Sequence, residues 1–280
     1  MAHNPVGRAA AKHPAIVKLG RVGWFAKGVV YVLAGGLALL VVDRSFGWTD
    51  VAVGPKEASP TGAIKEVAQS TGGPLLLIAL AVGMFLYAAW RLATAVLPGS
   101  TDAEGLATRV GYGVSAILYT TLGVTAIALA RTRAAKINGN KTVTDLTSRL
   151  MQHTAGRWLI GIAGALTIGA GLYRFAKGLK SDVTEDVDMS GMSPERSRWT
   201  RRLGAAGELG RGIALGLIGF FLVRAAVTFN AKEATGLDGA LRRLALQTWG
   251  VLVVAAVGLG LVAYGLFCLV TVARRRLQAP

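Results

Sequence analysis

Basic and tyrosine side chains inside long apolar segments are the residues of this sequence that could do chemistry. An ionisable group within a membrane span is costly unless it pairs, lines water or reaches the headgroups, so function is best sought at such groups. The candidates for contact with lipid, a pathway or a partner are Lys27, Tyr31, Arg91, Glu208, Arg211 and Arg224.

The spacing of these residues predicts how each is accommodated. Lys27, Arg91 and Arg211 lie near the expected cytoplasmic ends of their segments, where a long side chain can reach the headgroups. Glu208 precedes Arg211 by three residues and could pair with it on one helix face. Arg224 has no such neighbour and lies about 18 Å of helix beyond Arg211. We therefore expect Arg224 to face protein or trapped water rather than lipid.

The sequence lacks the residue sets that catalysis and metal binding need. Its histidines, His3, His13 and His153, all lie outside the apolar segments, and a lone Cys268 cannot form an intramolecular disulfide. No paired carboxylates or activated nucleophile occur within those segments. We expect no catalytic residues, no metal site and no cofactor, so the protein is predicted not to be an enzyme.

The composition is that of a membrane protein. Of 280 residues, 52% are hydrophobic and 16% charged, which is too apolar for an ordinary soluble domain. About 20 apolar residues suffice to cross a bilayer as a helix. Continuous apolar runs occur at residues 24–42, 74–97, 110–130, 158–175, 209–229 and 249–273. They predict an all-α polytopic protein with six transmembrane helices and, lacking strict alternation, argue against a β-barrel.

The net charge of +16 predicts contact with anionic lipid rather than with nucleic acid. The basic residues are spread over every loop and both tails, instead of gathering with aromatic residues on one soluble domain. Lys and Arg favour the cytoplasmic side, and their distribution places both termini there. We therefore expect a multi-pass protein of the plasma (inner) membrane with anionic lipids on its cytoplasmic side.

One pattern of small residues and tyrosine recurs three times. The three copies are Ala79, Gly83, Tyr87; Ala165, Gly169, Tyr173; and Ala256, Gly260, Tyr264. Positions four apart share a helix face, and membrane helices associate through small residues that let backbones approach. We predict that each copy is the seam where the second helix of a repeat packs on a first helix.

The first helices carry a matching pattern. Gly23, Lys27 and Tyr31 recur as Gly111, Ser115 and Tyr119 after 88 residues, and as Gly207, Arg211 and Leu215 after 96 more. A period with two spans brings every copy back to the same side of the membrane. The sequence therefore predicts three parallel two-helix repeats, which could close around a pseudo-threefold axis or lie in a row.

The predicted organisation has five parts. These are a cytoplasmic tail (1–18), repeat 1 (19–98), repeat 2 (107–180), an acidic cytoplasmic linker (181–200) and repeat 3 (201–276). The linker has no periodic apolar face and is predicted to be mobile. Within each repeat, capping and amphipathic patterns near 59–69, 144–152 and 238–247 predict three short helices in the outer interface.

These repeats resemble a known family. A first helix with Gly-x-x-x-Lys/Arg, a short helix ending in Gln before a Gly-containing entry, and a second helix with Gly-x-x-x-Tyr are similar to domain of unknown function 1206. The resemblance covers residues 19–276 and implies an integral membrane protein of the actinobacterial type with three tandem two-helix units. It brings no activity, cofactor or catalytic residue. The second copy departs most, with Ser115 in place of the basic residue.

Two functions remain open from the sequence. The first is a structural or partner-binding membrane subunit, with a protein partner or a homo-oligomer. The alternative is a transporter or channel for a small molecule, ion or lipid along a central path. A polar passage lined by Lys27, Tyr31, Tyr119 and Arg211 would favour transport, whereas a closed apolar core would favour the subunit.

Overall fold

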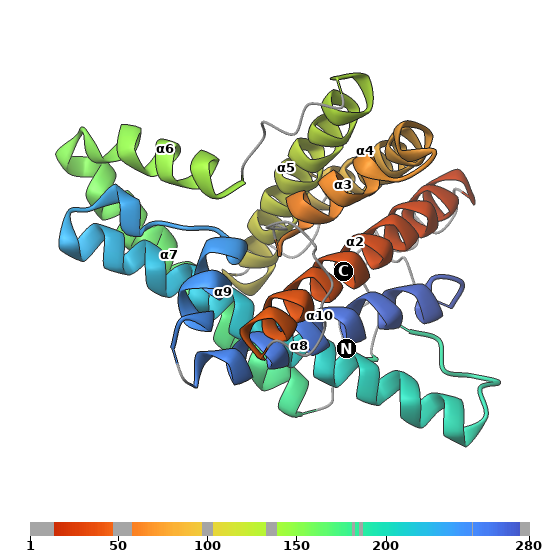
Figure 1. Ribbon diagram of the computed structural model, residues 1–280. Helices are drawn as coiled ribbons and strands as arrows, with labels where there is room; N and C mark the ends of the chain where they lie inside the picture. Colours follow the sequence, from red (N-terminus) through yellow and green to blue (C-terminus); the bar gives the residue numbers. More distant parts are fainter. Residues whose placement is uncertain are drawn as a thin grey trace.

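The computed structural model is all-helical (Figure 1). It describes residues 14–46, 58–96, 103–132, 139–180, 183–184, 187–247 and 249–274. Six helices in this part of the chain are long and apolar enough to cross a membrane. They are α2 (Pro14–Phe46), α4 (Gly73–Val96), α5 (Ala103–Thr132), α7 (Thr154–Leu179), α8 (Pro194–Thr228) and α10 (Gly250–Thr271). The predicted fold class is confirmed.

A short helix stands between the two spans of each repeat. These helices are α3 (Pro60–Gln69), α6 (Gly139–Met151) and α9 (Leu237–Ala245), with a 3₁₀ turn, η1 (Ala231–Glu233), before α9. As predicted, Ser59 caps α3, because its side chain accepts a hydrogen bond from the Gly62 amide at 3.1 Å. We call the end of the bundle with α3, α6 and α9 the interfacial end.

A glycine marks the entry to each second span, at Gly73, Gly156 and Gly250. A Cβ atom at any of the three would collide with the backbone of the preceding short helix. The chain turns so tightly from the interfacial helix into the span that only glycine fits. This close approach explains the Gly-containing entry that all three repeats share.

The spans pack in the order α5, α4, α2, α10, α8, α7 (Figure 1). Repeats 1 and 3 form closed hairpins, since α2 packs on α4 and α8 packs on α10. The helices of repeat 2 are separated instead: α5 packs on α4, α7 packs on α8, and α5 and α7 do not pack along each other. The described helices therefore form an open row rather than a closed pseudo-threefold ring.

Two helix pairs meet along glycines spaced seven residues apart. On α7, Cβ atoms added at Gly164, Gly171 and Gly178 would lie within 3 Å of α8. The facing residues of α8 include Gly212 and Gly219, where an added Cβ would lie as close to α7. Such contact lets two backbones approach and gain van der Waals packing in lipid.

The pair α2 and α10 is built in the same way. Gly28 of α2 faces Gly265 of α10, and Gly35 faces Gly258. A Cβ at Gly35 would lie 2.7 Å from the carbonyl oxygen of Gly258. These glycines bring the first helix of repeat 1 against the second helix of repeat 3 and so join the two halves of the row.

In two repeats the glycine and the tyrosine of the predicted four-residue seam pack as expected but the alanine does not, and in the third repeat the whole seam fails. Gly83 meets Ala26 of α2, and Gly260 meets Gly210 of α8, each at about 2.6 Å from an added Cβ. Tyr87 and Tyr264 are buried beside these glycines, whereas Ala79 and Ala256 are exposed.

In repeat 2 the prediction is wrong. Ala165, Gly169 and Tyr173 are exposed, and no described atom lies within 4 Å of a Cβ built on Gly169. The reason is that α7 turns a different face, that of Gly171, towards α8.

The predicted acidic linker is shorter and more ordered than expected. Helix α8 already begins at Pro194, capped by Ser193, whose side chain accepts from the Arg196 amide at 3.4 Å. Val187 is buried, and the Asp188 amide donates to the Arg274 carbonyl oxygen at 2.8 Å. The described part of the linker therefore packs against the end of α10.

Topology can be tested with single cysteines in a Cys268→Ser background. Thr71, Gln152 and Gln247 are exposed at the interfacial end, and Ser190 is exposed at the opposite end. If both termini are cytoplasmic, an impermeant maleimide should label cysteines at the first three positions in intact cells and label Ser190→Cys only after lysis. The reverse pattern would place the interfacial end in the cytoplasm.

Candidate functional site

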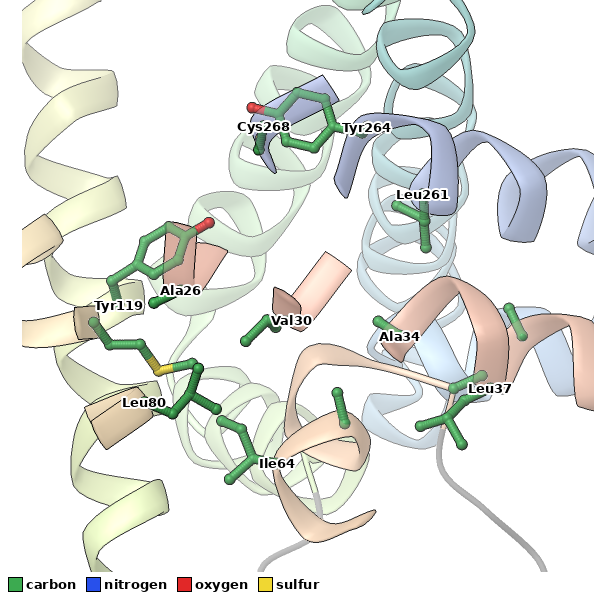
Figure 2. Close-up of a cluster of buried hydrophobic side chains, with 14 of the residues drawn as sticks. Ala26, Val30, Ala34, Leu37, Ile64, Leu80, Tyr119, Leu261, Tyr264 and Cys268 are labelled. Atoms are coloured by element: carbon green, nitrogen blue, oxygen red, sulfur yellow. The ribbon is translucent and has the colours of Figure 1, made fainter. Parts of the chain in front are cut away.

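Lys27 lies at the centre of the bundle rather than at its surface. Its side chain is buried, with 4% exposed, and its Nζ donates a hydrogen bond to the Tyr87 hydroxyl at 3.1 Å. The neighbouring turns of α2 carry Ala26 and Val30, which are small enough for other helices to approach closely (Figure 2). The expectation that Lys27 reaches the headgroups is wrong, because its side chain is enclosed by α4, α5 and α10.

Five aromatic rings surround the Lys27 ammonium group, and we call them the aromatic cage. The Nζ atom lies between 4.5 and 6.0 Å from the ring centroids. The rings belong to Trp24, Tyr31, Tyr87, Tyr119 and Tyr264. A cation near aromatic faces is attracted by their quadrupoles, and this attraction grows where water is excluded. The cage replaces part of the hydration that Lys27 loses on burial.

Arg91 extends the site along α4. Its Nε donates to the Tyr87 hydroxyl at 2.9 Å, so this one oxygen accepts from both Lys27 and Arg91. The guanidinium carbon also lies 4.6 Å from the Trp90 ring centroid and 4.5 Å from that of Tyr112. Arg91 is therefore held between aromatic rings, and Tyr87 links it to Lys27.

Arg211 occupies the position in repeat 3 that Lys27 occupies in repeat 1. Its guanidinium carbon lies 4.0 Å from the Tyr264 ring centroid and 5.5 Å from that of Tyr31. The predicted pair with Glu208 is present, with Arg211 Nη1 3.0 Å from Oε1. The other carboxylate oxygen of Glu208 binds Arg174 of α7 at 3.0 Å. Glu208 thus forms ion pairs with two arginines at once.

The site has more basic side chains than carboxylates, and more N–H donors than described protein acceptors. Within the described chain, Glu208 pairs with Arg174 and Arg211, whereas the other two basic side chains of the site, Lys27 and Arg91, bond to the neutral Tyr87 hydroxyl. A guanidinium group has five N–H donors and an ammonium group three. Among described protein groups, Arg211 makes one hydrogen bond, to Glu208, and Lys27 makes one, to Tyr87. An anionic acceptor would fit this arrangement.

A cavity of about 220 Å³ adjoins Arg211 and Tyr31. Helices α2 and α10 contribute Ala34 and Leu261 to its lining, and both residues are labelled in Figure 2. Leu118 of α5 forms one side. The remaining lining comes from Ala214, Leu215 and Ile218 of α8, and from Pro60 of α3 and Leu237 of α9 at the interfacial end. Except for Arg211 and the Tyr31 hydroxyl, the lining side chains are apolar.

Arg224 stands apart from this site. Its side chain is 50% exposed and lies near the interfacial end of α8, where its Nε is 3.4 Å from Glu233 of η1. Arg243 of α9 binds the same carboxylate oxygen at 2.9 Å. Sequence spacing could not find this partner, because Glu233 lies outside the helix that carries Arg224.

The structure brings most of the predicted residues together and adds others. Lys27, Tyr31, Glu208 and Arg211 form one site, with Arg91 joined through Tyr87. Four further residues belong to this site that the sequence patterns do not predict as its members: Trp24, Trp90, Tyr112 and Arg174. One signal was available for Trp24: it lies three residues before Lys27 and therefore on the same helix face.

Comparisons with known proteins agree with the repeat pattern. The family described as Domain of Unknown Function (DUF1206) matches residues 22–97, 110–181 and 206–275. The chain is also similar to the uncharacterized protein YxxB of Bacillus subtilis (strain 168), with 29% identity over 259 residues, which cover 91% of this chain and 90% of that protein. No solved structure matches the chain. These matches do not show an actinobacterial source. The protein is a membrane protein that belongs to the DUF1206 family, with the family domain present three times in tandem.

Proposed function

We propose that this protein binds an anionic amphiphile inside the membrane, as a binding protein or transporter, with Arg211 as the residue that holds the anionic group. One observation carries the proposal: the Arg211 side chain is only 11% exposed, uses one hydrogen bond on described protein groups, and lines an otherwise apolar cavity. The cavity would take an apolar tail or ring, while the basic residues would take the charged head.

The electrostatics of the centre support an anion. Four basic side chains and one carboxylate lie within one connected set of contacts. Charges in a low-dielectric interior attract a counter-ion more strongly than in water. An anion beside Arg211 would also lie near Lys27, since both cations contact the rings of Tyr31 and Tyr264.

A partner-binding membrane subunit is the second candidate. It is favoured by the exposed small face of α7, where Ala165 and Gly169 meet no described helix. Such a face could accept a transmembrane helix of another protein. For either function we propose a non-catalytic protein of the plasma membrane with cytoplasmic termini.

Binding of radiolabelled oleate to the purified protein in an uncharged detergent would test the proposed function. A hydrogen bond to a charged group contributes about 1.5–3 kcal/mol, and each 1.4 kcal/mol is tenfold in affinity. Arg211→Gln should therefore weaken oleate binding roughly ten- to a hundredfold. Arg211→Lys should retain a larger share, because it keeps the charge.

Two controls separate a specific site from general affinity for detergent. Oleyl alcohol has the same tail without the charge and should bind much more weakly than oleate. Arg224→Gln removes a cation at the interfacial end and should leave oleate binding unchanged. Equal binding of oleate and oleyl alcohol, or unchanged oleate binding by a folded Arg211→Gln protein, would contradict the proposed function.

A further inference from the structure

Repeats 1 and 3 close through the same pair of contacts. In repeat 1, Gly23 lies against Tyr87 and Ala26 against Gly83. In repeat 3, Gly207 lies against Tyr264 and Gly210 against Gly260. Each first residue belongs to the first helix of its repeat and each second residue to the second helix. The two closed hairpins thus define which positions should meet in repeat 2.

The matching positions of repeat 2 are Gly111, Val114, Gly169 and Tyr173, and they are apart. No described atom lies within 4 Å of a Cβ built on Gly111 or on Gly169. Val114 is 51% exposed and Tyr173 is 69% exposed. Repeat 2 therefore keeps the two glycines of a closed hairpin, with Val114 in place of the small Ala26 and Gly210, but holds its two helices open.

The cavity beside Arg211 is placed so that closing repeat 2 would shut it. Leu118 of α5 forms one side of the cavity, and Leu215 and Ile218 of α8 form the other. Helix α7 packs against α8. Helices α2 and α10 also line the cavity, and their glycine seam joins the half of the row that contains α5 to the half that contains α7. A rotation about that seam would bring α5 towards α7 and α8.

Repeat 2 also lacks the contact that ties the other two hairpins. Lys27 bonds to the Tyr87 hydroxyl in repeat 1, and Arg211 lies over the Tyr264 ring in repeat 3. The corresponding residue of repeat 2 is Ser115, whose hydroxyl donates to the Gly111 carbonyl of its own helix at 2.9 Å. A serine in that position makes no cation–tyrosine contact, so repeat 2 lacks this link between its two helices.

We infer that repeat 2 is a lateral gate between the bilayer and the cavity. In the open form described here, an amphiphile enters from the lipid between α5 and α8. In the closed form, Gly111 packs on Tyr173 and Val114 on Gly169, as their counterparts do in repeats 1 and 3. The ligand's route rests on the proposed anion site, whereas closure of the gate does not.

Disulfide trapping in native membranes tests the closure. Val114→Cys and Gly169→Cys are combined in a Cys268→Ser background and oxidised with copper phenanthroline, and the product is read on a non-reducing gel and by peptide mass spectrometry. If the gate closes, a disulfide forms within one chain, because the Cβ atoms come within reach. Gly161→Cys with Ala226→Cys is the positive control, because a Cβ at Gly161 of α7 would lie 3.6 Å from that of Ala226 of α8.

Two results would overturn the gate. If the control pair between α7 and α8 links and the repeat 2 pair does not, the helices of repeat 2 stay apart. If the repeat 2 pair links only between chains, a second copy occupies the exposed face of α7. Each cysteine alone should give no link within a chain.

A second measurement connects the gate to the ligand. The trapped protein should lose oleate binding at least tenfold and regain it on reduction. Full oleate binding by the trapped protein would show that the ligand does not enter through repeat 2. Absence of oleate binding by the unlinked protein would contradict the proposed function alone, because the disulfide readout needs no ligand.

Discussion

Replacement of Glu208 by leucine is expected to destabilise the protein by roughly 3–5 kcal/mol, because it leaves two arginines without their shared carboxylate. The Glu208 side chain is 13% exposed and Arg211 is 11% exposed, so neither charge is well hydrated. Arg174, at 34% exposed, can still reach solvent or headgroups. Most of the loss should therefore come from Arg211. Thermal unfolding in detergent, followed by tryptophan fluorescence, measures the effect.

A double variant distinguishes the two possible causes of the lost stability, an unpaired buried charge and lost side-chain packing. If Arg211 is the unpaired charge, Glu208→Leu combined with Arg211→Met should be more stable than Glu208→Leu alone. Glu233→Gln at the interfacial end is the matched control, and it should cost less because Arg224 there is half exposed. A double variant less stable than the single one would assign the effect to packing.

Gly171→Leu is expected to destabilise by roughly 1–3 kcal/mol or more, by analogy with overpacked cores. An added Cβ at Gly171 would lie 2.8 Å from the carbonyl oxygen of Gly212 and 2.9 Å from the amide nitrogen of Gly216. Both neighbours are backbone atoms, so no side chain can move aside. The helices α7 and α8 would have to separate along their longest contact. Unfolding by heat or by titration with a denaturing detergent would show the loss.

Gly169→Leu provides the control on the same helix. It lies two residues away on the exposed face, with no described neighbour within 4 Å, and should change stability by no more than about 0.5 kcal/mol. The four-residue pattern in the sequence predicts the opposite order, with Gly169 as the sensitive position. Equal melting of the two variants would contradict the packing of α7 on α8 by its seven-residue glycines.

The candidate site shows what spacing can reveal within one helix. The pair of Glu208 with Arg211 follows from a three-residue separation, and the structure contains it. Arg174 is missing from that prediction, because it comes from a helix 34 residues earlier in the chain. The burial of Lys27 is missed for the same reason, because most of the rings around its ammonium group come from other helices. Spacing within one helix cannot show that the four tyrosines and Trp24 meet there.

The sequence contains two glycine patterns, one with a spacing of four residues and one with a spacing of seven, and the predicted seam rests on the first. The four-residue pattern is correct for α4 and α10 at Gly83 and Gly260, but not at Ala79 and Ala256, which are exposed. The seven-residue pattern of Gly164, Gly171 and Gly178 was also present in the sequence and determines the face of α7. Both spacings place small residues on one helix face, so local geometry cannot rank them. The choice depends on which neighbouring helix offers glycines at the facing positions.

The sequence by itself determined the six spans, the three short interfacial helices and the threefold repetition. These depend on apolar length, on capping residues such as Ser59 and on helical periodicity, which are local properties of the chain. Only the tertiary structure decided that repeat 2 is open, that Lys27 is enclosed by rings from four helices, and that Arg211 borders a cavity. The physical reason is that helix partners in a membrane are selected by close backbone contact between surfaces far apart in sequence, and related repeats can make that selection differently.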